Sequence, residues 1–196
     1  TAVENNRSMR ITNSFELTSN QNPGESQVFR AGRANGAYSG TIYGQGYTIS
    51  FSGIHPSETQ YSGSWTYGGQ SGNFNGWSIG GLVNTLNGNG AIYDLNVVMK
   101  SGSAAIAANN DSFVYMGVFA GALEGNAKVE NCTLTINGGG RLMVGRGTNW
   151  AGVSESWLGV GGLAGRINGT GVVINNVTVS MDQILIEGGQ RTSEQG

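Results

Sequence analysis

The sequence predicts an all-β fold, a right-handed parallel β-helix (β-solenoid) with protruding Gly/Ser/Asn-rich loops, and three observations lead there. First, the 196 residues include 35 glycines and only 11% charged residues, whereas soluble domains average roughly 7% glycine and 25% charged residues. Second, short runs of alternating apolar and polar residues recur along the chain, as in strands with one buried face. Third, these runs belong to a repeat, which is the signature of stacked architectures.

Each predicted strand has apolar residues at its first, third and fifth positions, with mostly polar residues between them. Helices are not expected, because glycine interrupts almost every segment and each glycine inside a helix costs about 1 kcal/mol. The strands predicted in this way are Tyr47–Phe51, Leu95–Met99, Cys132–Ile136 and Val177–Met181.

Three similar units follow one another, and a degenerate unit precedes them. Each of the three has a Gly-rich opening and then an apolar strand, and an aromatic residue precedes it. We therefore expect residues 1–196 to form a single parallel β-helix domain or a fragment of one. The repeat units span about 38–51, 77–99, 115–136 and 157–181.

An Asp or Asn recurs at one position of the repeat, at Asp94, Asn131 and Asn176. Apolar residues lie two places before it and one, three and five places after it. Two inward residues three places apart break the period of two, so the chain must bend at this position. Asn and Asp tolerate the left-handed conformation that such a bend needs. Stacked repeats would align these side chains as a structural ladder, with Gly46 taking the position in the degenerate unit.

The distance between these positions exceeds the roughly twenty-odd residues expected for one coil. Each repeat therefore holds either two coils or one coil with a long protruding loop. We favour the loop, because the segments between the strands are rich in Gly, Ser and Asn and mostly lack alternation. These segments are Ser52–Asn75, Lys100–Ser112 and Asn137–Ser156.

Short glycine segments at the start of the units carry a resemblance to a known family. They are Gly81-Leu82, Phe119-Ala-Gly121 and Gly162-Leu-Ala-Gly165, each followed by an Ile/Val-x-Asn/Asp-apolar strand. This pattern resembles the GLUG-type repeats of bacterial surface proteins and adhesins, and residues 38–49 resemble the entry turn before such repeats. The resemblance covers roughly residues 38–181. It implies an extracellular, repetitive, non-catalytic segment of a larger adhesin-like protein.

Charge and hydropathy argue against two classes of partner. The net charge is −2 and the basic residues are spread along the chain, so no basic stripe is available to neutralise the phosphates of a nucleic acid. The longest nearly apolar run, Phe113–Leu123, is shorter than the roughly 18 residues that span a bilayer. We expect neither nucleic-acid binding nor membrane insertion.

Residues for catalysis and for metal or cofactor binding are scarce, so we predict no enzyme, no cofactor and no metal site. The only aspartates are Asp94, Asp111 and Asp182, and they do not form the paired carboxylates that glycoside cleavage requires. Glu124 and Glu130 are expected on the solvated surface. The single histidine, His55, lies in a polar segment. The single cysteine, Cys132, is expected to be a small buried side chain.

Aromatic residues among small polar ones are the best candidates for a recognition surface. Trp65, Tyr67 and Trp150 lie in Ser- and Gly-rich segments, where aromatic rings stack on sugars or on a protein partner. Possible N-glycosylation sites are Asn6, Asn110 and Asn168, since each begins an Asn-x-Ser/Thr motif.

The outward positions of the repeated strands are mostly Thr and Ser. The Asn96 and Val98 positions interrupt this array, which argues against an ice-binding face.

The sequence thus favours a non-enzymatic extracellular structural or adhesin module that assembles or binds through a repetitive surface. Its expected location is extracellular, on a cell surface or on a virion surface. The expected partners are other copies in a homo-oligomer or filament, adjacent segments of a longer chain, or a host or glycan surface. The alternative is a carbohydrate-binding or carbohydrate-cleaving β-helix of the tail-spike kind. Trp65 and Tyr67 exposed in a groove would favour the sugar binder, and clustered carboxylates would favour the enzyme.

Overall fold

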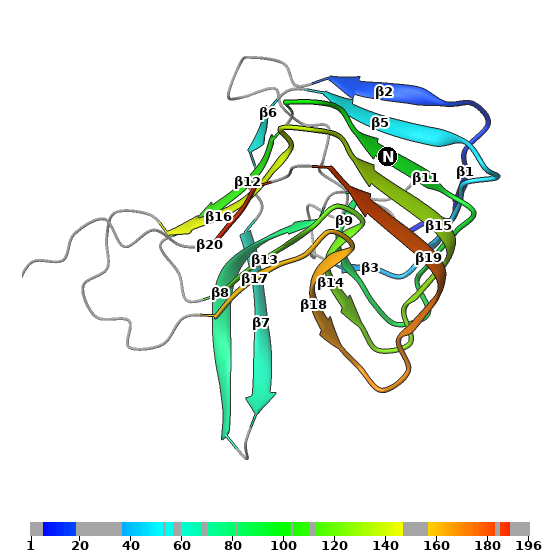
Figure 1. The fold of residues 1–196 in the computed structure, drawn as a ribbon. Coiled ribbons are helices and arrows are strands. Elements are labelled where there is room, and N and C mark those ends of the chain that lie inside the picture. Colours follow the sequence, from blue (N-terminus) through cyan, green and yellow to red (C-terminus); the bar gives the residue numbers. More distant parts are fainter. Residues whose placement is uncertain are drawn as a thin grey trace, which may run out of the picture.

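The computed structural model contains only strands, turns and connecting segments in the part of the chain that it describes (Figure 1). Consequently no helix there is long and apolar enough to cross a membrane. The described residues are 6–18, 37–52, 54–56, 60–67, 70–80, 82–102, 104–109, 113–146, 157–182 and 185–188.

The largest sheet, sheet A, contains eight strands that all pair in parallel. It bends along its length and curves around one side of the core like half of a barrel (Figure 1). Its strands are β1 (Met9–Arg10), β2 (Phe15–Thr18), β4 (Thr41–Tyr43), β5 (Thr48–Ser52), β10 (Ala91–Tyr93), β11 (Asn96–Met99), β15 (Lys128–Ile136) and β19 (Val173–Met181).

Three four-stranded sheets complete the arrangement. Sheet B contains β3 (Ala37–Tyr38), β9 (Val83–Leu86), β14 (Ala120–Glu124) and β18 (Ala164–Asn168). Sheet C contains β6 (Ile54–Pro56), β12 (Ala104–Asn109), β16 (Arg141–Arg146) and β20 (Leu185–Gly188). Sheet D contains β7 (Gln60–Tyr67), β8 (Gln70–Gly80), β13 (Phe113–Gly117) and β17 (Trp157–Val160).

The chain visits the sheets in the repeating order B, A, C, D, and we call one such passage a circuit. Strands of successive circuits pair side by side, so stacked positions in sheet A are separated by 33 or 34, 48 or 50, 37 and 45 residues. The all-β, parallel architecture predicted from the sequence is confirmed. Each repeat is one circuit, and its length exceeds the twenty-odd residues expected for a coil.

Long loops were predicted within each repeat, and this prediction is wrong where parts of these segments form strands. The expected loops contain β6, β7 and most of β8 in the first case, β12 in the second and β16 in the third. Gly-, Ala- and Ser-rich segments can form these strands because parallel backbone pairing with the neighbouring circuit fixes them. A strand held in this way does not need its own alternation of apolar and polar residues.

One unit departs from the parallel pattern. Strands β7 and β8 form an antiparallel hairpin, in which Gln60 pairs with Trp77 and Tyr67 with Gln70. Only the last part of β8 joins the stack, where Trp77–Gly80 pairs with β13. The rest of the hairpin extends away from the other sheets (Figure 1).

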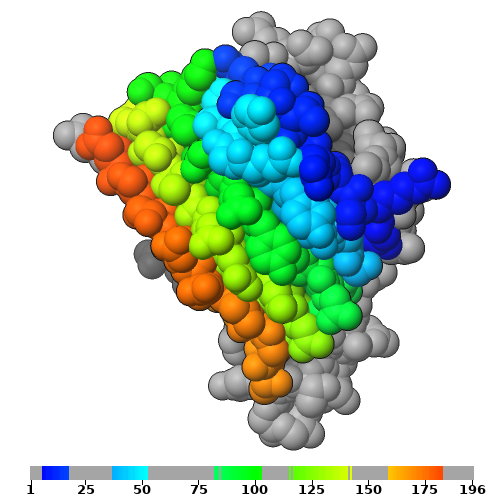
Figure 2. Space-filling model, turned by 90° about the vertical axis from the view of Figure 1, so that its right-hand side faces the viewer, coloured from blue at the N-terminus to red at the C-terminus, as the bar shows by residue number. Residues whose placement is uncertain are grey.

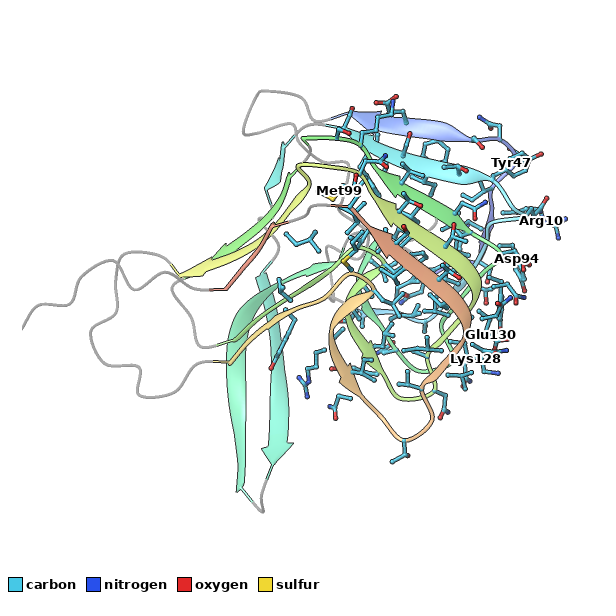
Figure 3. All side chains as sticks on the ribbon, in the orientation of Figure 1. Arg10, Tyr47, Asp94, Met99, Lys128 and Glu130 are labelled. Carbon is cyan, nitrogen blue, oxygen red and sulfur yellow. The ribbon has the colours of Figure 1, made fainter. Side chains whose placement is uncertain are left out.

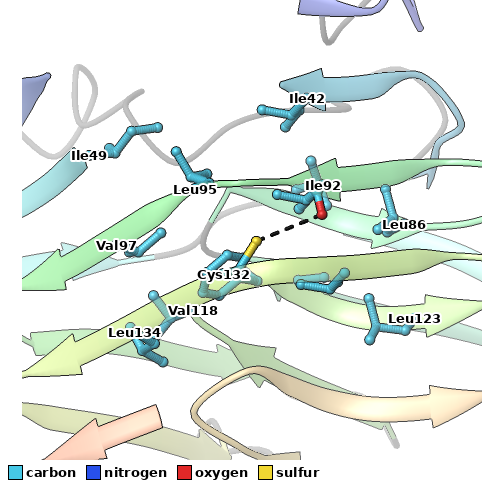
Figure 4. Close-up of a cluster of buried hydrophobic side chains, with 14 of the residues drawn as sticks. Ile42, Ile49, Leu86, Ile92, Leu95, Val97, Val118, Leu123, Cys132 and Leu134 are labelled. Atoms are coloured by element: carbon cyan, nitrogen blue, oxygen red, sulfur yellow. Dashed lines mark hydrogen bonds between the residues drawn. The ribbon is translucent and has the colours of Figure 1, made fainter. Parts of the chain in front are cut away.

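The core consists of aligned side chains, one from each circuit. Ile42, Ile92 and Val129 share one column of sheet A and are at most 3% exposed. Cys132 lies in the next column on that face, among the apolar side chains shown in Figure 4. Its thiol donates a weak hydrogen bond to the Ile92 carbonyl, with 3.7 Å between the sulfur and oxygen atoms. The prediction of a buried, unpaired cysteine is confirmed.

Sheet A bends where the recurring Asp or Asn was found. The φ angles are 52° at Asp94, 55° at Asn131 and 49° at Asn176, so the predicted left-handed conformation is confirmed. The degenerate unit needs a longer bend, because Gly44–Tyr47 connects its two strands where Asp94 and Leu95 suffice one circuit later. Both Gln45 and Gly46 are left-handed in this longer bend.

Glycine is required at a second kind of corner, where the chain passes from sheet D to sheet B. A Cβ atom on Gly117 would lie 2.3 Å from the Cα of Ala164 and 2.4 Å from the carbonyl oxygen of Ala120. Both neighbours are backbone atoms, so they cannot move aside without shifting a strand. The corner therefore depends on the close approach that only glycine allows.

Candidate functional site

The outer face of sheet A is the most regular surface of the described molecule. In the space-filling view, successive circuits lie across it as parallel stripes (Figure 2). Two columns of outward side chains run across these stripes in register. From β5 to β19 none of their members is charged, whereas in β2 the charged Glu16 lies beside Ser50 of one column. The first column is Thr48, Asn96, Thr133 and Thr178, and the second is Ser50, Val98, Thr135 and Ser180.

Hydrogen bonds connect neighbouring circuits along this face. The Thr133 hydroxyl donates to the side-chain oxygen of Asn96 at 2.6 Å, and the Asn96 amide donates to the Gly46 carbonyl at 2.8 Å. The Asn176 amide likewise donates to the side-chain oxygen of Asn131 at 2.9 Å. Asn131 and Asn176 are therefore joined through their side chains between the last two circuits, and extension of the predicted ladder to Asp94 stays a prediction.

A pair of tyrosines lies on the same face, beside the bend. Tyr43 and Tyr93 are neighbours in register, with ring centroids 6.0 Å apart and ring planes inclined by 31°. Tyr43 is 42% exposed, and Tyr47 in the bend is 36% exposed. Aromatic side chains with one free ring face are suited to stacking on sugars or on a protein partner.

Charged residues flank the tyrosine pair in the same column. Arg10 precedes Tyr43, and Glu130 follows Tyr93. Figure 3 shows Arg10, Tyr47 and Glu130 along the outer margin of the molecule. Sequence reasoning missed this group, although a usable signal exists, because each tyrosine directly follows an inward isoleucine at the same position of its unit.

The aromatic residues that the sequence singled out are placed only in part. Trp65 and Tyr67 lie on β7 of the hairpin, opposite Gly72 and Gln70 of β8. Trp150 lies outside the described residues. The structure therefore does not test whether the three form one recognition surface, and this remains a prediction.

The predicted glycosylation sites differ in their surroundings. Asn6 is exposed, and its side-chain oxygen accepts a hydrogen bond from the Ser39 amide at 3.2 Å. Asn168 is exposed at the end of β18. Asn110 lies outside the described residues. Two of the three motifs thus present an exposed asparagine, and whether either is modified stays a prediction.

A half-buried ionic group lies between sheets B and D. The Arg166 guanidinium is 5.2 Å from the centre of the Tyr115 ring and 3.8 Å from a carboxylate oxygen of Glu124. Burial raises the pKa of the Tyr115 hydroxyl, and the charge of Arg166 opposes this rise. Burial also raises the pKa of Glu124 against the attraction of Arg166. The expectation that Glu124 is a solvated surface residue is wrong, because β14 extends through it and packs near sheet D.

Groups suited to metal binding are not brought together in the described part of the chain. No cluster of three or more His, Cys, Asp or Glu side chains forms there. The Cys132 thiol is unsuited to nucleophilic chemistry, because burial raises its pKa to about 11 and little thiolate forms near neutral pH.

The last circuit leaves its inner face uncovered. Ile167, Ile174, Val179 and Met181 are 56%, 41%, 39% and 41% exposed. Their partners in the preceding circuit are all fully buried, at 0% exposure. These partners, in the same order, are Leu123, Val129, Leu134 and Ile136.

Comparisons with protein-family models, with curated proteins and with solved structures find no match to this chain.

Proposed function

We propose that the chain is a right-handed parallel β-helix segment that works as a non-enzymatic, extracellular structural or adhesin module. The parallel circuits and their aligned inner columns support this fold designation. Right-handedness is supported by the general rule that about 98% of crossovers between parallel strands of one sheet have this hand. The resemblance to GLUG-type repeats supports the location at a bacterial surface.

The observation that carries the proposal is the outer face of sheet A, with its two aligned columns that are uncharged from β5 to β19. Removing water from uncharged, small side chains on binding costs less free energy than removing water from charged side chains. Its regular register also presents the same groups at each strand spacing of about 4.8 Å. Such a face suits contact with an extended or repetitive surface.

The test measures binding of the purified 196-residue chain to immobilised glycans and extracellular-matrix proteins. Thr133→Lys places a charge in the centre of the face and is expected to weaken binding at least tenfold. Thr170→Lys is the matched control, because Thr170 is exposed in a turn away from the two columns. Binding that Thr133→Lys leaves unchanged would rule out this face as the contact surface.

A second candidate function, carbohydrate binding, is favoured by the Tyr43–Tyr93 pair, in which Tyr43 is exposed and Tyr93 half-buried. A sugar ring stacked on Tyr43 would also lie near the charged groups of Arg10 and Glu130. Tyr43→Phe keeps the ring and is expected to retain glycan binding, whereas Tyr43→Ala is expected to abolish it. Equal binding by both variants on a glycan array would exclude the tyrosine pair as a sugar platform.

A further inference from the structure

An inner column of sheet A runs through every circuit and is uncovered at both ends, while Met9 and Leu17, which begin two other inner columns, are half-buried. The uncovered column contains Phe15, Ile49, Val97, Leu134 and Val179 in register. Its three middle members are at most 4% exposed, whereas Phe15 is 38% exposed and Val179 is 39% exposed. Each middle member has a neighbouring circuit on both sides, whereas each end member has one on a single side.

Within the part of the chain that the structure describes, the strands at both ends are paired along one edge only. Among the described residues, β19 pairs only with β15, β18 only with β14 and β20 only with β16. At the other end, β1 pairs only with β4 and β2 only with β5. An edge without a partner presents unpaired N–H and C=O groups and is a template for another strand.

The inward side chains of the first circuit are of the same apolar kind as those that would cover the last circuit if the stack continued. Met9, Phe15 and Leu17 of β1 and β2 occupy the same three inner columns as Ile174, Val179 and Met181 of β19. Stacking one on the other would place an apolar side chain over Ile174, Val179 and Met181, as between any two successive circuits of sheet A.

The outward columns place no like charges together in such a contact. Arg10 shares a column with Asn175, and Glu16 shares one with Ser180. Like charges directly opposite each other on paired strands would be destabilising. The small net charge of −2 also gives little repulsion between copies.

We infer that the last circuit binds the first circuit of a second copy of this chain, with β1 and β2 of that copy adding to β19 as a parallel extension of sheet A. The contact joins two different surfaces and is therefore heterologous. Because it continues the stacking direction of sheet A, it repeats from copy to copy as an open stack and does not close into a ring. The inference rests on the proposed function, because it specifies the partner through which the structural module assembles.

The test follows the mass of the purified chain over a concentration series by sedimentation velocity and light scattering. The wild-type chain is expected to form oligomers that lengthen with concentration. Val179→Lys blocks the last circuit and Phe15→Lys blocks the first, and each variant alone is expected to stay monomeric. An equal mixture of the two is expected to form dimers, because each supplies the surface that the other retains.

Controls separate a blocked contact from a misfolded chain. Thr170→Lys adds the same charge in the same circuit but away from the inner columns and is expected to assemble like the wild type. Each variant must keep the Cys132 thiol unreactive under native conditions, which shows that the core is intact. A monomeric wild-type chain at every concentration, or a mixture that fails to dimerise, would overturn the inference.

The outcome is separable from that of the proposed function. Monomeric Val179→Lys keeps the outer face of sheet A and is expected to retain a measurable affinity per chain for a glycan or matrix target. If the wild type stays monomeric while Thr133→Lys weakens target binding, the function stands and the stacking contact fails. If copies stack but no target binds, the stacking contact stands and the adhesin function fails.

Discussion

Asparagine at the bend of sheet A combines two properties that few residues share. It accepts a positive φ, which costs other L-residues roughly 1–2 kcal/mol, and its amide can bond to the same residue type in the next circuit. The angles at Asn131 and Asn176 are 55° and 49°, and their side chains are 2.9 Å apart. The bend and the ladder therefore depend on the same side chains.

Replacing Asn131 by alanine is expected to lower the free energy of unfolding by about 1–2 kcal/mol, because it adds backbone strain and removes the acceptor for Asn176. Asn131→Gly is expected to cost less, since glycine accepts the positive φ. Urea denaturation measures both. Asn175→Ala is the matched control, being an exposed asparagine in an extended strand, and an Asn131→Ala effect no larger than the control would contradict the argument.

These bend residues were predictable from the sequence, because an Asp or Asn between inward residues three places apart is a local signal. The surroundings of Glu124 were not predictable. Arg166 reaches it because β18 pairs with β14 in sheet B, and the sharp corner between sheets B and D brings Tyr115 close to Arg166. A contact between distant segments leaves no periodic trace in the sequence.

Glu124 is expected to make stability fall as pH rises. Burial raises its pKa above the ordinary value of 4.5, so the folded chain holds the proton more tightly than the unfolded chain. The free energy of unfolding therefore declines from the unfolded pKa up to the folded pKa. Glu124→Gln is expected to remove this decline, as measured by urea denaturation at a series of pH values.

Glu16 provides a control of opposite sign. A hydrogen bond from Lys100 lowers the pKa of Glu16, so its contribution is present above the unfolded pKa and lost as pH falls through the folded pKa. Glu16→Gln should therefore change the pH dependence in the other direction. If both variants changed the pH dependence of the unfolding free energy in the same direction, the surroundings assigned to one of the two carboxyl groups would be wrong.

At the scale of the elements, two different causes make segments into strands: a buried apolar face and pairing with a neighbouring circuit. The strands of sheet A were found from alternation, because one of their faces is buried and the other is exposed. The sequence predicts loops where β6, β7, β12 and β16 form, since the predicted loop segments are rich in Gly, Ser and Asn and Ala104–Asn109 has no clear alternation. Pairing with the neighbouring circuit stabilises these strands, and pairing between distant segments cannot be seen in one sequence.

The corner from sheet D to sheet B is expected to tolerate no side chain at Gly117. Gly117→Ala forces a Cβ atom against backbone atoms of two strands, and such overpacking costs typically about 1–3 kcal/mol. Gly138→Ala is the control, since its Cβ would meet a side-chain oxygen of Asp182 at an ordinary 3.5 Å. Thermal unfolding of both variants measures the difference, and equal melting temperatures would refute the steric account.

At the scale of the whole molecule, the stack is expected to be most stable in its middle. Strands β11 and β15 have a paired neighbour on each side, whereas β2 and β19 have one. In monomeric Val179→Lys, we expect amide hydrogens of β11 and β15 to exchange slowest and those of β2 and β19 fastest. Hydrogen-exchange mass spectrometry on dilute protein measures this order, and uniform protection would contradict it.

The circuits differ in length by as many as 17 residues, since stacked positions are 33 to 50 residues apart, yet the inner columns of sheet A stay in register. Part of the extra length forms the β7–β8 hairpin. The chain leaves the stacked strands at Gln60 and rejoins them at Trp77, which is paired with Gln60. The register of the inner columns therefore does not depend on the length of the segment between Gln60 and Trp77. A foreign peptide exchanged for the hairpin tip near Tyr67 and Gln70 would be displayed at a fixed place, which would make the chain a scaffold for presenting epitopes.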